Sequence, residues 1–200
     1  MKKGRIYTII FMLIISAVFA LLLGGANAYY LPKIKENELL DEKIAILYVF
    51  DIDSSGSNQD ILNRFDENIK LTSISDIELY EYTSEDGQAI AYAVPFTGAG
   101  LWGSISGYMG VTADFQQITG LVFTDHSETP GLGGRIDELT YREQFKNLHI
   151  TPETKLVYGE SGESKIDAIT GATSTSNAVL RILNQLLEDT ISKLEEAAND

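Results

Sequence analysis

The chain has 200 residues, of which 44% are hydrophobic, and its formal net charge is −14 at pH 7. These values are typical of one globular domain with an additional segment, without a bias toward disorder or a collagen-like repeat. The acidic balance argues against nucleic acid as a partner, because phosphate backbones are bound by clusters of Lys and Arg. The absence of cysteine excludes disulfides, thiolate metal sites and cysteine nucleophiles.

The first predicted element is a membrane-spanning helix within residues 1–31. Basic residues precede a mostly apolar run from Ile6 to Leu23, and the next charged residue is Lys33. A run of this length can cross a hydrocarbon core of ~30 Å as a helix. By the positive-inside rule, we expect a cytoplasmic N-terminus and an extracytoplasmic domain, with Tyr29 and Tyr30 at the far interface.

A cleaved signal peptide is the alternative to this anchor. Ala26-Asn27-Ala28 fits the A-x-A pattern of a cleavage site. Signal cores usually have ~7–15 residues, so the length of the apolar run favours a retained anchor.

Residues 32–75 are predicted to form a juxtamembrane helical region. The apolar spacing that follows Pro32 indicates a helix that continues the membrane helix after a kink at that residue. A polar loop comes next, and Asn58 or Asp60 can cap a short second helix that reaches Ile69.

Residues 76–200 are predicted to form the main domain. From Ile77 onward apolar and polar residues alternate, which indicates β-strands. The expected strands are 77–82, 89–96, 105–112 and 118–125, in two hairpins with turns at Glu85-Asp86-Gly87 and near Asp114. Pro95 indicates that the second strand ends early or lies at an edge. The predicted fold class is α+β: one transmembrane helix followed by a single domain with a twisted antiparallel sheet and flanking helices.

The last part of the chain is predicted to end in an amphipathic helix. A short helix over 141–146 and short strands over 156–158 and 165–169 come first, and apolar residues then recur at three-four spacing from Val179 to Leu194. Ser174, Thr175 or Ser176 can cap the N–H groups of the first turn. The same groups, with the positive end of the helix dipole, favour a bound anion, so the spacing alone leaves both interpretations open.

The residues before this helix indicate which anion is expected. Asp167-Ala-Ile-Thr-Gly-Ala-Thr173 resembles the D-x-x-[ST]-G-A-T signature of the FMN-binding domain found in the C subunit of the sodium-pumping NADH:quinone reductase and in the G subunit of the Rnf complex. In that family the last threonine carries FMN through a phosphoester bond, which a flavin transferase forms with FAD as donor. The resemblance implies that residues 76–200 are an FMN-binding domain with covalent FMN on Thr173. Its other implied cofactor-binding residues here are Asp167, Thr170, Gly171, Ala172 and Ser174.

A second string supports the same resemblance. Glu128-Thr-Pro-Gly-Leu-Gly133 is similar to a hallmark loop of the family, which packs against the isoalloxazine ring. Turn chemistry alone would explain its glycines. The residues that the resemblance assigns to flavin contacts are Glu128, Thr129, Gly131, Leu132 and Gly133. Backbone N–H groups of this loop would bond the flavin, and Leu132 would pack on the ring face.

Three further residues have two interpretations each. Leu101-Trp102-Gly103 resembles the family's G-L-W segment, so Trp102 is either a core residue or a flavin contact. Asp167 is expected to accept backbone N–H bonds within the signature turn rather than to act as a base. His126 either borders the flavin or, as we expect, lies at the surface.

Other chemistries find no support in the sequence. No cluster of ligands at metal spacing is present, so no metal site is expected. The sequence lacks the phosphate loop, which excludes nucleotide hydrolysis, and it lacks a dinucleotide fingerprint followed by a long helix, which excludes ordinary NADH binding. It also lacks the G-x-S-x-G elbow of hydrolases, which excludes hydrolase activity.

The resemblance implies a membrane-anchored flavoprotein subunit that relays electrons within a respiratory ion-translocating complex of the Rnf or Na⁺-pumping type. It would have no catalytic residue of its own, and its partners would be other membrane redox subunits, the flavin transferase and the membrane. Two alternatives remain: a stand-alone extracytoplasmic FMN protein with diffusible acceptors, and a tethered non-redox scaffold module.

Overall fold

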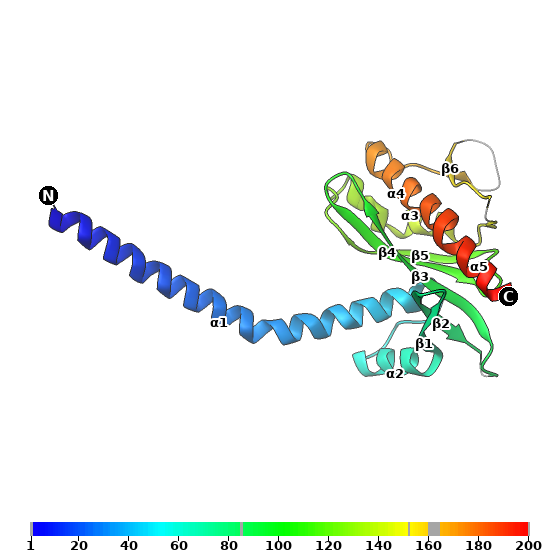
Figure 1. Cartoon of the computed structure of the whole chain (residues 1–200), viewed down its shortest axis with the longest axis horizontal. Coiled ribbons are helices and arrows are strands. Elements are labelled where there is room, and N and C mark those ends of the chain that lie inside the picture. Colours follow the sequence, from blue (N-terminus) through cyan, green and yellow to red (C-terminus); the bar gives the residue numbers. More distant parts are fainter. Residues whose placement is uncertain (1, 85, 152, 160–164, 200) are drawn as a thin grey trace. The chain divides into compact units, whose positions relative to one another are not determined.

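The computed structural model of the chain describes residues 2–84, 86–151, 153–159 and 165–199. It separates into two compact units, residues 1–41 and 42–200 (Figure 1). Helix α1 (Lys2–Val49) contains all described residues of the first unit and forms the beginning of the second.

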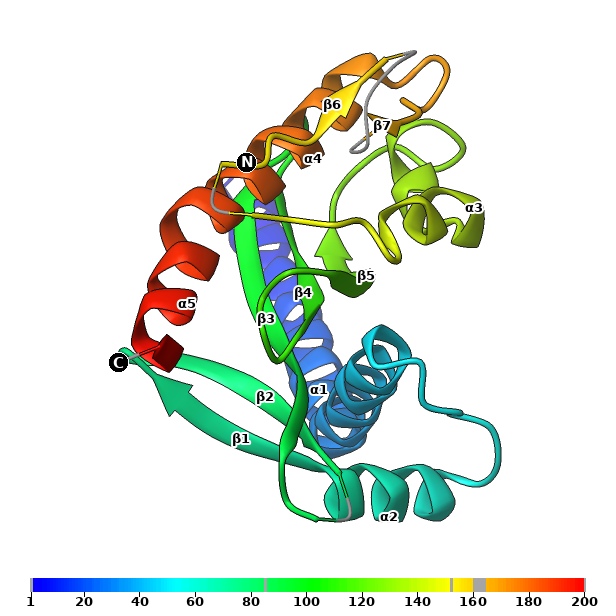
Figure 2. The same ribbon diagram turned by 90° about the vertical axis from the view of Figure 1, so that its right-hand side faces the viewer.

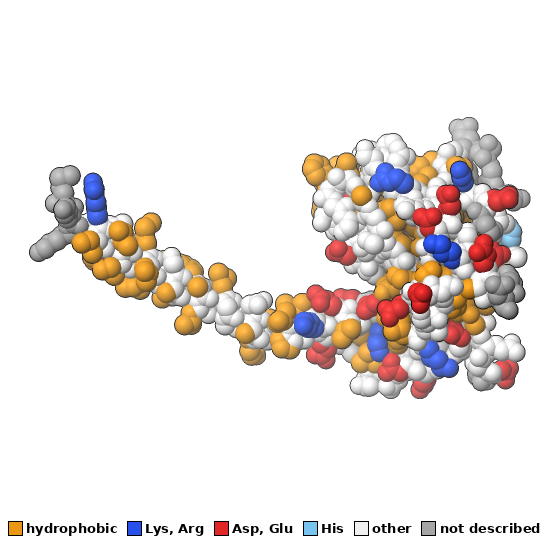
Figure 3. All heavy atoms as spheres, viewed as in Figure 1, with side chains coloured by type: hydrophobic (Ala, Val, Ile, Leu, Met, Phe, Trp, Pro, Cys, Tyr) orange, Lys and Arg blue, Asp and Glu red, His pale blue; other side chains and the backbone are white. Residues whose placement is uncertain are grey.

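The first unit is an exposed apolar helix. Its most apolar stretch has a mean hydropathy of 2.8 and is 0% buried, and α1 continues without interruption through Pro32. Figure 3 shows hydrophobic side chains along this part of the helix. The helix is long and apolar enough to cross a membrane, in agreement with the predicted N-terminal element.

The second unit contains a five-stranded antiparallel sheet in which each strand pairs with the next along the chain. The strands are β1 (Ile69–Ile74), β2 (Ile77–Thr83), β3 (Ala89–Ala99), β4 (Ser104–Thr112) and β5 (Ile118–His126). The predicted α+β class and the predicted antiparallel sheet are therefore confirmed. Strand β1 was not expected, because its six residues follow directly on α2 (Asn58–Asn68) and were assigned to a helical region.

At Pro95, strand β3 follows the second of the two predicted alternatives, an edge position. It does not end early at Pro95 but continues to Ala99. Its pairing with β2 stops at Ala93, and only β4 accompanies it beyond that point. Pro95 thus lies in a stretch with one neighbouring strand, where its missing N–H leaves no gap in a ladder.

One face of the sheet carries the main core. Opposed pairs such as Val94 and Met109 put their side chains on this face, and the helix α4 (Thr173–Leu186) packs against it. Helix α4 continues through a π-helical turn (Leu187–Ile191) into α5 (Ser192–Asn199), and Figure 2 shows this run beside the sheet. The contact is close at Gly98, where a Cβ would lie 2.5 Å from Ile182 Cγ1.

The opposite face is covered by the end of α1 that belongs to the second unit. Val49 is fully buried, and a Cβ at Gly110 or Gly120 would lie within 2.9 Å of its backbone. Thr119 Oγ1 donates to the Val49 carbonyl at 2.7 Å and so satisfies one of the last acceptors of the helix. The last residues of α1, including Ile46, Leu47 and Val49, are therefore part of the core of the second unit.

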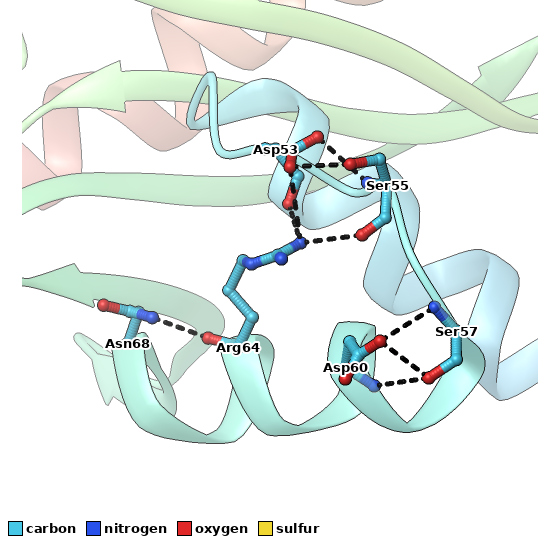
Figure 4. Close-up of polar contacts among 6 residues, drawn as sticks. All are labelled: Asp53, Ser55, Ser57, Asp60, Arg64 and Asn68. Carbon is cyan, nitrogen blue, oxygen red and sulfur yellow. Dashed lines mark hydrogen bonds and ion pairs between the residues drawn. The ribbon is translucent and has the colours of Figure 1, made fainter.

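Helix α2 begins with a complete capping box (Figure 4). Ser57 Oγ accepts from the Asp60 N–H at 3.3 Å, and the Asp60 carboxylate accepts from the Ser57 N–H at 3.0 Å. The cap is thus Ser57 rather than the predicted Asn58 or Asp60, and Asp60 is its reciprocal partner. Arg64 donates to the carbonyl oxygens of Asp53 and Ser55 and holds the preceding loop.

Short elements connect β5 to α4. They are η1 (Gly133–Asp137), α3 (Leu139–Arg142), η2 (Glu143–Phe145) and the parallel pair β6 (Val157–Tyr158) and β7 (Lys165–Ile166). They match the predicted short helix and short strands in position. Glu85, part of the predicted first turn, lies outside the described residues, while Gly87 in that turn has a φ of +76°.

Candidate functional site

The N-terminus of α4 has no side-chain cap. Ala172 occupies the cap position with φ −129° and ψ 41°, and the first helical bond runs from the Ser176 N–H to the Ala172 carbonyl at 2.9 Å. Thr173 is the first residue of the helix, and its side chain is exposed. The helix therefore begins without a side-chain cap, and the N–H groups of such a first turn favour an anion.

The prediction that Ser174, Thr175 or Ser176 caps this helix is wrong. Thr175 Oγ1 donates instead to Glu128 Oε2 at 2.6 Å. Ser176 Oγ accepts from the Ile169 N–H at 3.1 Å, and both side chains are buried. Thr175 and Ser176, two of the predicted caps, thus connect α4 to Glu128 and to Ile169.

The turn before the helix depends on Gly171. Its φ of +81° is in the left-handed region, which a side chain at this position would disfavour. The Ala172 N–H donates to the Ile169 carbonyl at 3.0 Å and closes the turn. The Asp167 N–H donates to Gln144 Oε1 at 2.7 Å, while its predicted role as an acceptor within the turn stays a prediction. Thr170 is exposed.

Glu128 accepts hydrogen bonds from two other segments of this region. It is only 5% exposed, and its Oε1 accepts from the backbone N–H groups of Leu101 at 2.7 Å and Trp102 at 3.2 Å. Its Oε2 accepts from Thr175. One carboxylate therefore joins the loop after β3, the loop after β5 and the first turn of α4.

Two glycines make room for this carboxylate. A Cβ at Gly100 would lie 2.5 Å from Glu128 Oε1, and a Cβ at Gly133 would lie 2.7 Å from Oε2. Contacts this short require glycine at both positions. Gly100, which precedes Leu101-Trp102, and Gly133 of the loop after β5 thus have a packing role that turn chemistry alone does not indicate.

The charge of Glu128 is stabilised by its donors. Burial alone would raise the pKa of this carboxyl, but the hydrogen bonds from Thr175, Leu101 and Trp102 outweigh it and lower the pKa below its ordinary value. The side chain is therefore ionised at neutral pH, close to the first turn of α4.

His126 supports the same loop and is not the surface residue that the sequence predicts. Its side chain is 14% exposed, its Nδ1 accepts from the Glu128 N–H at 3.2 Å, and its Nε2 lies 2.8 Å from Asp137 Oδ2. The proton therefore resides on Nε2, which donates to Asp137. Among the described residues, no group of three or more His, Asp or Glu side chains could hold a metal ion.

The loop from Thr129 to Gly134 is a compact turn. The N–H groups of Leu132 and Gly134 both donate to the Thr129 carbonyl, at 3.1 and 3.0 Å, and Gly131 has a φ of +75°. The Leu132 side chain is 47% exposed. Its Cδ2 would lie 3.6 Å from a Cβ at Gly171, so this loop borders the signature turn.

Trp102 is not a core residue. It is 68% exposed and its neighbour Leu101 is 52% exposed, on a loop that Arg181 also holds by donating to the Ala99 carbonyl at 2.7 Å. The structure thus brings exposed apolar side chains of two loops to the region of an exposed threonine. An uncapped helix end would suit a phosphate, and the apolar rim would suit an aromatic ring, so these residues fit FMN.

Known proteins with a similar sequence or fold share this part of the chain. Residues 100–188 match the FMN-binding domain. The matched segment contains the Trp102 loop, Glu128 and the N-terminus of α4.

Curated relatives belong to two kinds of complex. The chain is 38% identical over 109 residues to the C subunit of the Na(+)-translocating NADH-quinone reductase of Pasteurella multocida, and the match covers 51% of this chain and 42% of that protein. It is 33% identical over 109 residues to the G subunit of the ion-translocating oxidoreductase complex of Methanosarcina acetivorans, covering 54% and 56%. Both matches thus span about half the length of the relative. With the C subunit of the reductase from Vibrio anguillarum, an identity of 25% extends over 91% of this chain and 90% of that protein.

Solved structures share the fold. NqrC of Shewanella oneidensis superposes with a TM-score of 0.68 at 19% identity, covering 78% of this chain and 95% of that one. The C subunit of the Na(+)-translocating NADH-quinone reductase from Parabacteroides distasonis superposes with a TM-score of 0.63 at 25% identity, covering 80% and 94%.

Proposed function

We propose that this protein is a membrane-anchored flavoprotein subunit that relays electrons through FMN esterified to Thr173, within a complex of the Rnf or Na⁺-pumping NADH:quinone reductase type. The observation that carries the proposal is the exposed Thr173 hydroxyl at the uncapped N-terminus of α4, inside the segment that matches the FMN-binding domain. The names of the curated relatives support the type of complex.

The attachment step is a phosphoryl transfer to Thr173. The threonine oxygen forms a bond to the FMN phosphorus of FAD, the pyrophosphate bond breaks, AMP leaves, and the hydroxyl proton is released. The attaching enzyme is a flavin transferase. The chain's contribution is to present the hydroxyl at the surface and to place first-turn N–H groups beside the phosphodiester charge.

The remaining cofactor contacts would come from two loops. Trp102 and Leu132 offer exposed apolar surface to the ring, and the Leu132 side chain brings the loop from Thr129 to Gly133 beside the signature turn. The other residues proposed to form this site, by contact with the cofactor or by support of the residues in contact, are Glu128, Gly131, Asp167, Thr170, Gly171, Ala172 and Ser174. FMN supplies electron-transfer chemistry, and the protein orients the cofactor and sets its potential.

Mass spectrometry tests the attachment. The full chain is expressed with and without a flavin transferase, and the intact mass is expected to rise by one FMN less one water only with the enzyme. Thr173→Ala is expected to abolish the label without unfolding the domain, because Thr173 is exposed. The matched control Thr124→Ala, at an exposed threonine on β5 outside the proposed site, should keep the label. Flavin fluorescence that persists on denatured Thr173→Ala would refute the assignment.

The anchor is proposed to place the domain outside the cytoplasm. The N-terminal helix is apolar enough to span a membrane, and its basic residues precede the apolar run. Because the chain has no cysteine, Ser73→Cys on β1 can be labelled by an impermeant maleimide. Ser73→Cys is expected to be labelled in intact cells, whereas Arg5→Cys should be labelled only after lysis. The opposite pattern would contradict an extracytoplasmic domain.

Purification from native membranes tests the complex. A tagged chain is expected to bring down multi-span redox subunits in mild detergent. A stand-alone flavoprotein would carry FMN but copurify with none of them, and a scaffold module would be colourless.

A further inference from the structure

We propose that Glu128 is a charged positioning residue of the FMN site: its buried carboxylate aligns the Trp102 loop with the first turn of α4 and holds the flavin potential down, without itself contacting the flavin. The proposal rests on the function proposed above. It replaces the flavin contact expected for Glu128 from the family-like string.

The hydrogen-bond inventory of Glu128 supports a positioning role. Both carboxylate oxygens are already used by Leu101, Trp102 and Thr175, and the side chain is 5% exposed. The glycines Gly100 and Gly133 close over its two oxygens. The residue thus faces the interior of the domain, while Trp102 and Thr173 face outward from the elements that it joins.

The charge of Glu128 gives the second part of the inference. Reduction adds negative charge to a flavin, and a nearby buried carboxylate disfavours it more strongly than an exposed one because solvent screens it less. Removing this charge should therefore shift the FMN potential to a more positive value. A residue with a purely steric role would not produce that shift.

The decisive variant is Glu128→Gln. The glutamine carbonyl can still accept from the two backbone N–H groups, and its amide can donate to Thr175 Oγ1, so the bridge is retained while the charge is lost. The matched control is Glu138→Gln, which removes the same charge from an exposed residue paired with Arg135.

Measurements on the flavinylated full chain compare the three proteins by redox titration. Glu128→Gln is expected to have a more positive midpoint potential than wild type, with Glu138→Gln unchanged or shifted much less. Equal potentials for wild type and Glu128→Gln would overturn the proposal. A wild-type chain that accepts no flavin would instead refute the proposed function.

Measurements on the flavin-free chain do not depend on the cofactor. Trp102 is the only tryptophan, so its fluorescence reports the loop that Glu128 holds. The groups that face the Glu128 carboxylate from the loop after β3 and from α4 are neutral: backbone N–H groups and the Thr175 hydroxyl. The titratable neighbour is His126 of β5, which is paired with Asp137.

The pKa of Glu128 is lowered from 4.5, so the wild-type emission is expected to change as the pH falls below that value. Glu128→Gln should lack this transition and Glu138→Gln should keep it. A transition that persists in Glu128→Gln contradicts the charged role, as does a wild-type chain without one. The wild-type titration decides the question even if Glu128→Gln does not fold.

Discussion

Two helices of the second unit begin in opposite ways. Helix α2 has a complete capping box, in which Ser57 and Asp60 satisfy each other's backbone N–H groups. Helix α4 has three hydroxyl side chains immediately after Thr173, yet none of them caps it. Thr175 and Ser176 bond instead to Glu128 and Ile169, and Ser174 is exposed, so the helix has no side-chain cap while its position is fixed.

The difference shows how a helix start becomes a binding site. A cap stabilises a helix by ~1 kcal/mol and at the same time occupies the groups that attract an anion. At α2 that stabilisation is kept. At α4 it is absent, and buried bonds from Thr175 and Ser176 hold the helix in place instead. Substitutions at the two helix starts should therefore have different consequences.

The largest effect on stability is expected at Thr175. Thr175→Val keeps the β-branched shape but removes the donor to Glu128 Oε2, a buried charged acceptor. Hydrogen bonds to charged groups contribute ~1.5–3 kcal/mol, so the free energy of unfolding should fall by about 2 kcal/mol. Urea unfolding of the full chain in detergent, followed by Trp102 fluorescence, measures this loss.

Ser174 supplies the control for that substitution. Its side chain is exposed, so Ser174→Ala should change the free energy of unfolding by no more than ~0.5 kcal/mol. Equal stabilities of Thr175→Val and wild type would mean that the Glu128 bond does not hold α4.

A smaller effect is expected at the α2 cap. Ser57→Ala removes the acceptor for the Asp60 N–H and should lower the free energy of unfolding by ~1 kcal/mol. Flavin attachment should remain at the wild-type level, because this cap lies on a different element from Thr173. Thr173→Ala is the opposite case, with attachment lost and stability retained. A loss of attachment in Ser57→Ala would remove the distinction between the two helix starts.

The sequence predicted those features that depend on local pattern. Alternating residues located strands β2 to β5, and three-four spacing placed Thr173 at the start of the last helix. Strand β1 was missed because six residues after a helix give a weak signal. Pro95 correctly indicated an edge position, but the strand continues past it to Ala99 because β4 still pairs with it there.

The roles of the Thr175 and Ser176 hydroxyls and of Trp102 could not be predicted from local sequence pattern. Glu128 and Thr175 are 47 residues apart in sequence, and their bond follows from the packing of α4 against the sheet. The same carboxylate accepts from the backbone N–H of Trp102 and so holds the loop on which the exposed indole lies. Candidate residues were thus found from motifs, whereas their contacts required the fold.

The smallest predicted effect is a pH dependence at the α2 cap. The Ser57 hydroxyl, and then its N–H, donate to Asp60 and lower the pKa of this carboxyl from 3.8. A carboxyl with a lowered folded-state pKa stabilises the protein above its unfolded-state value, and that contribution disappears as the pH falls through the folded-state pKa. Wild type should therefore be slightly more stable than Asp60→Asn at neutral pH, and the difference should vanish as the pH falls below 3.8. Thermal unfolding from pH 7 to pH 3 measures it, and a difference that is constant across this range would show that the asparagine acts through something other than the lost charge.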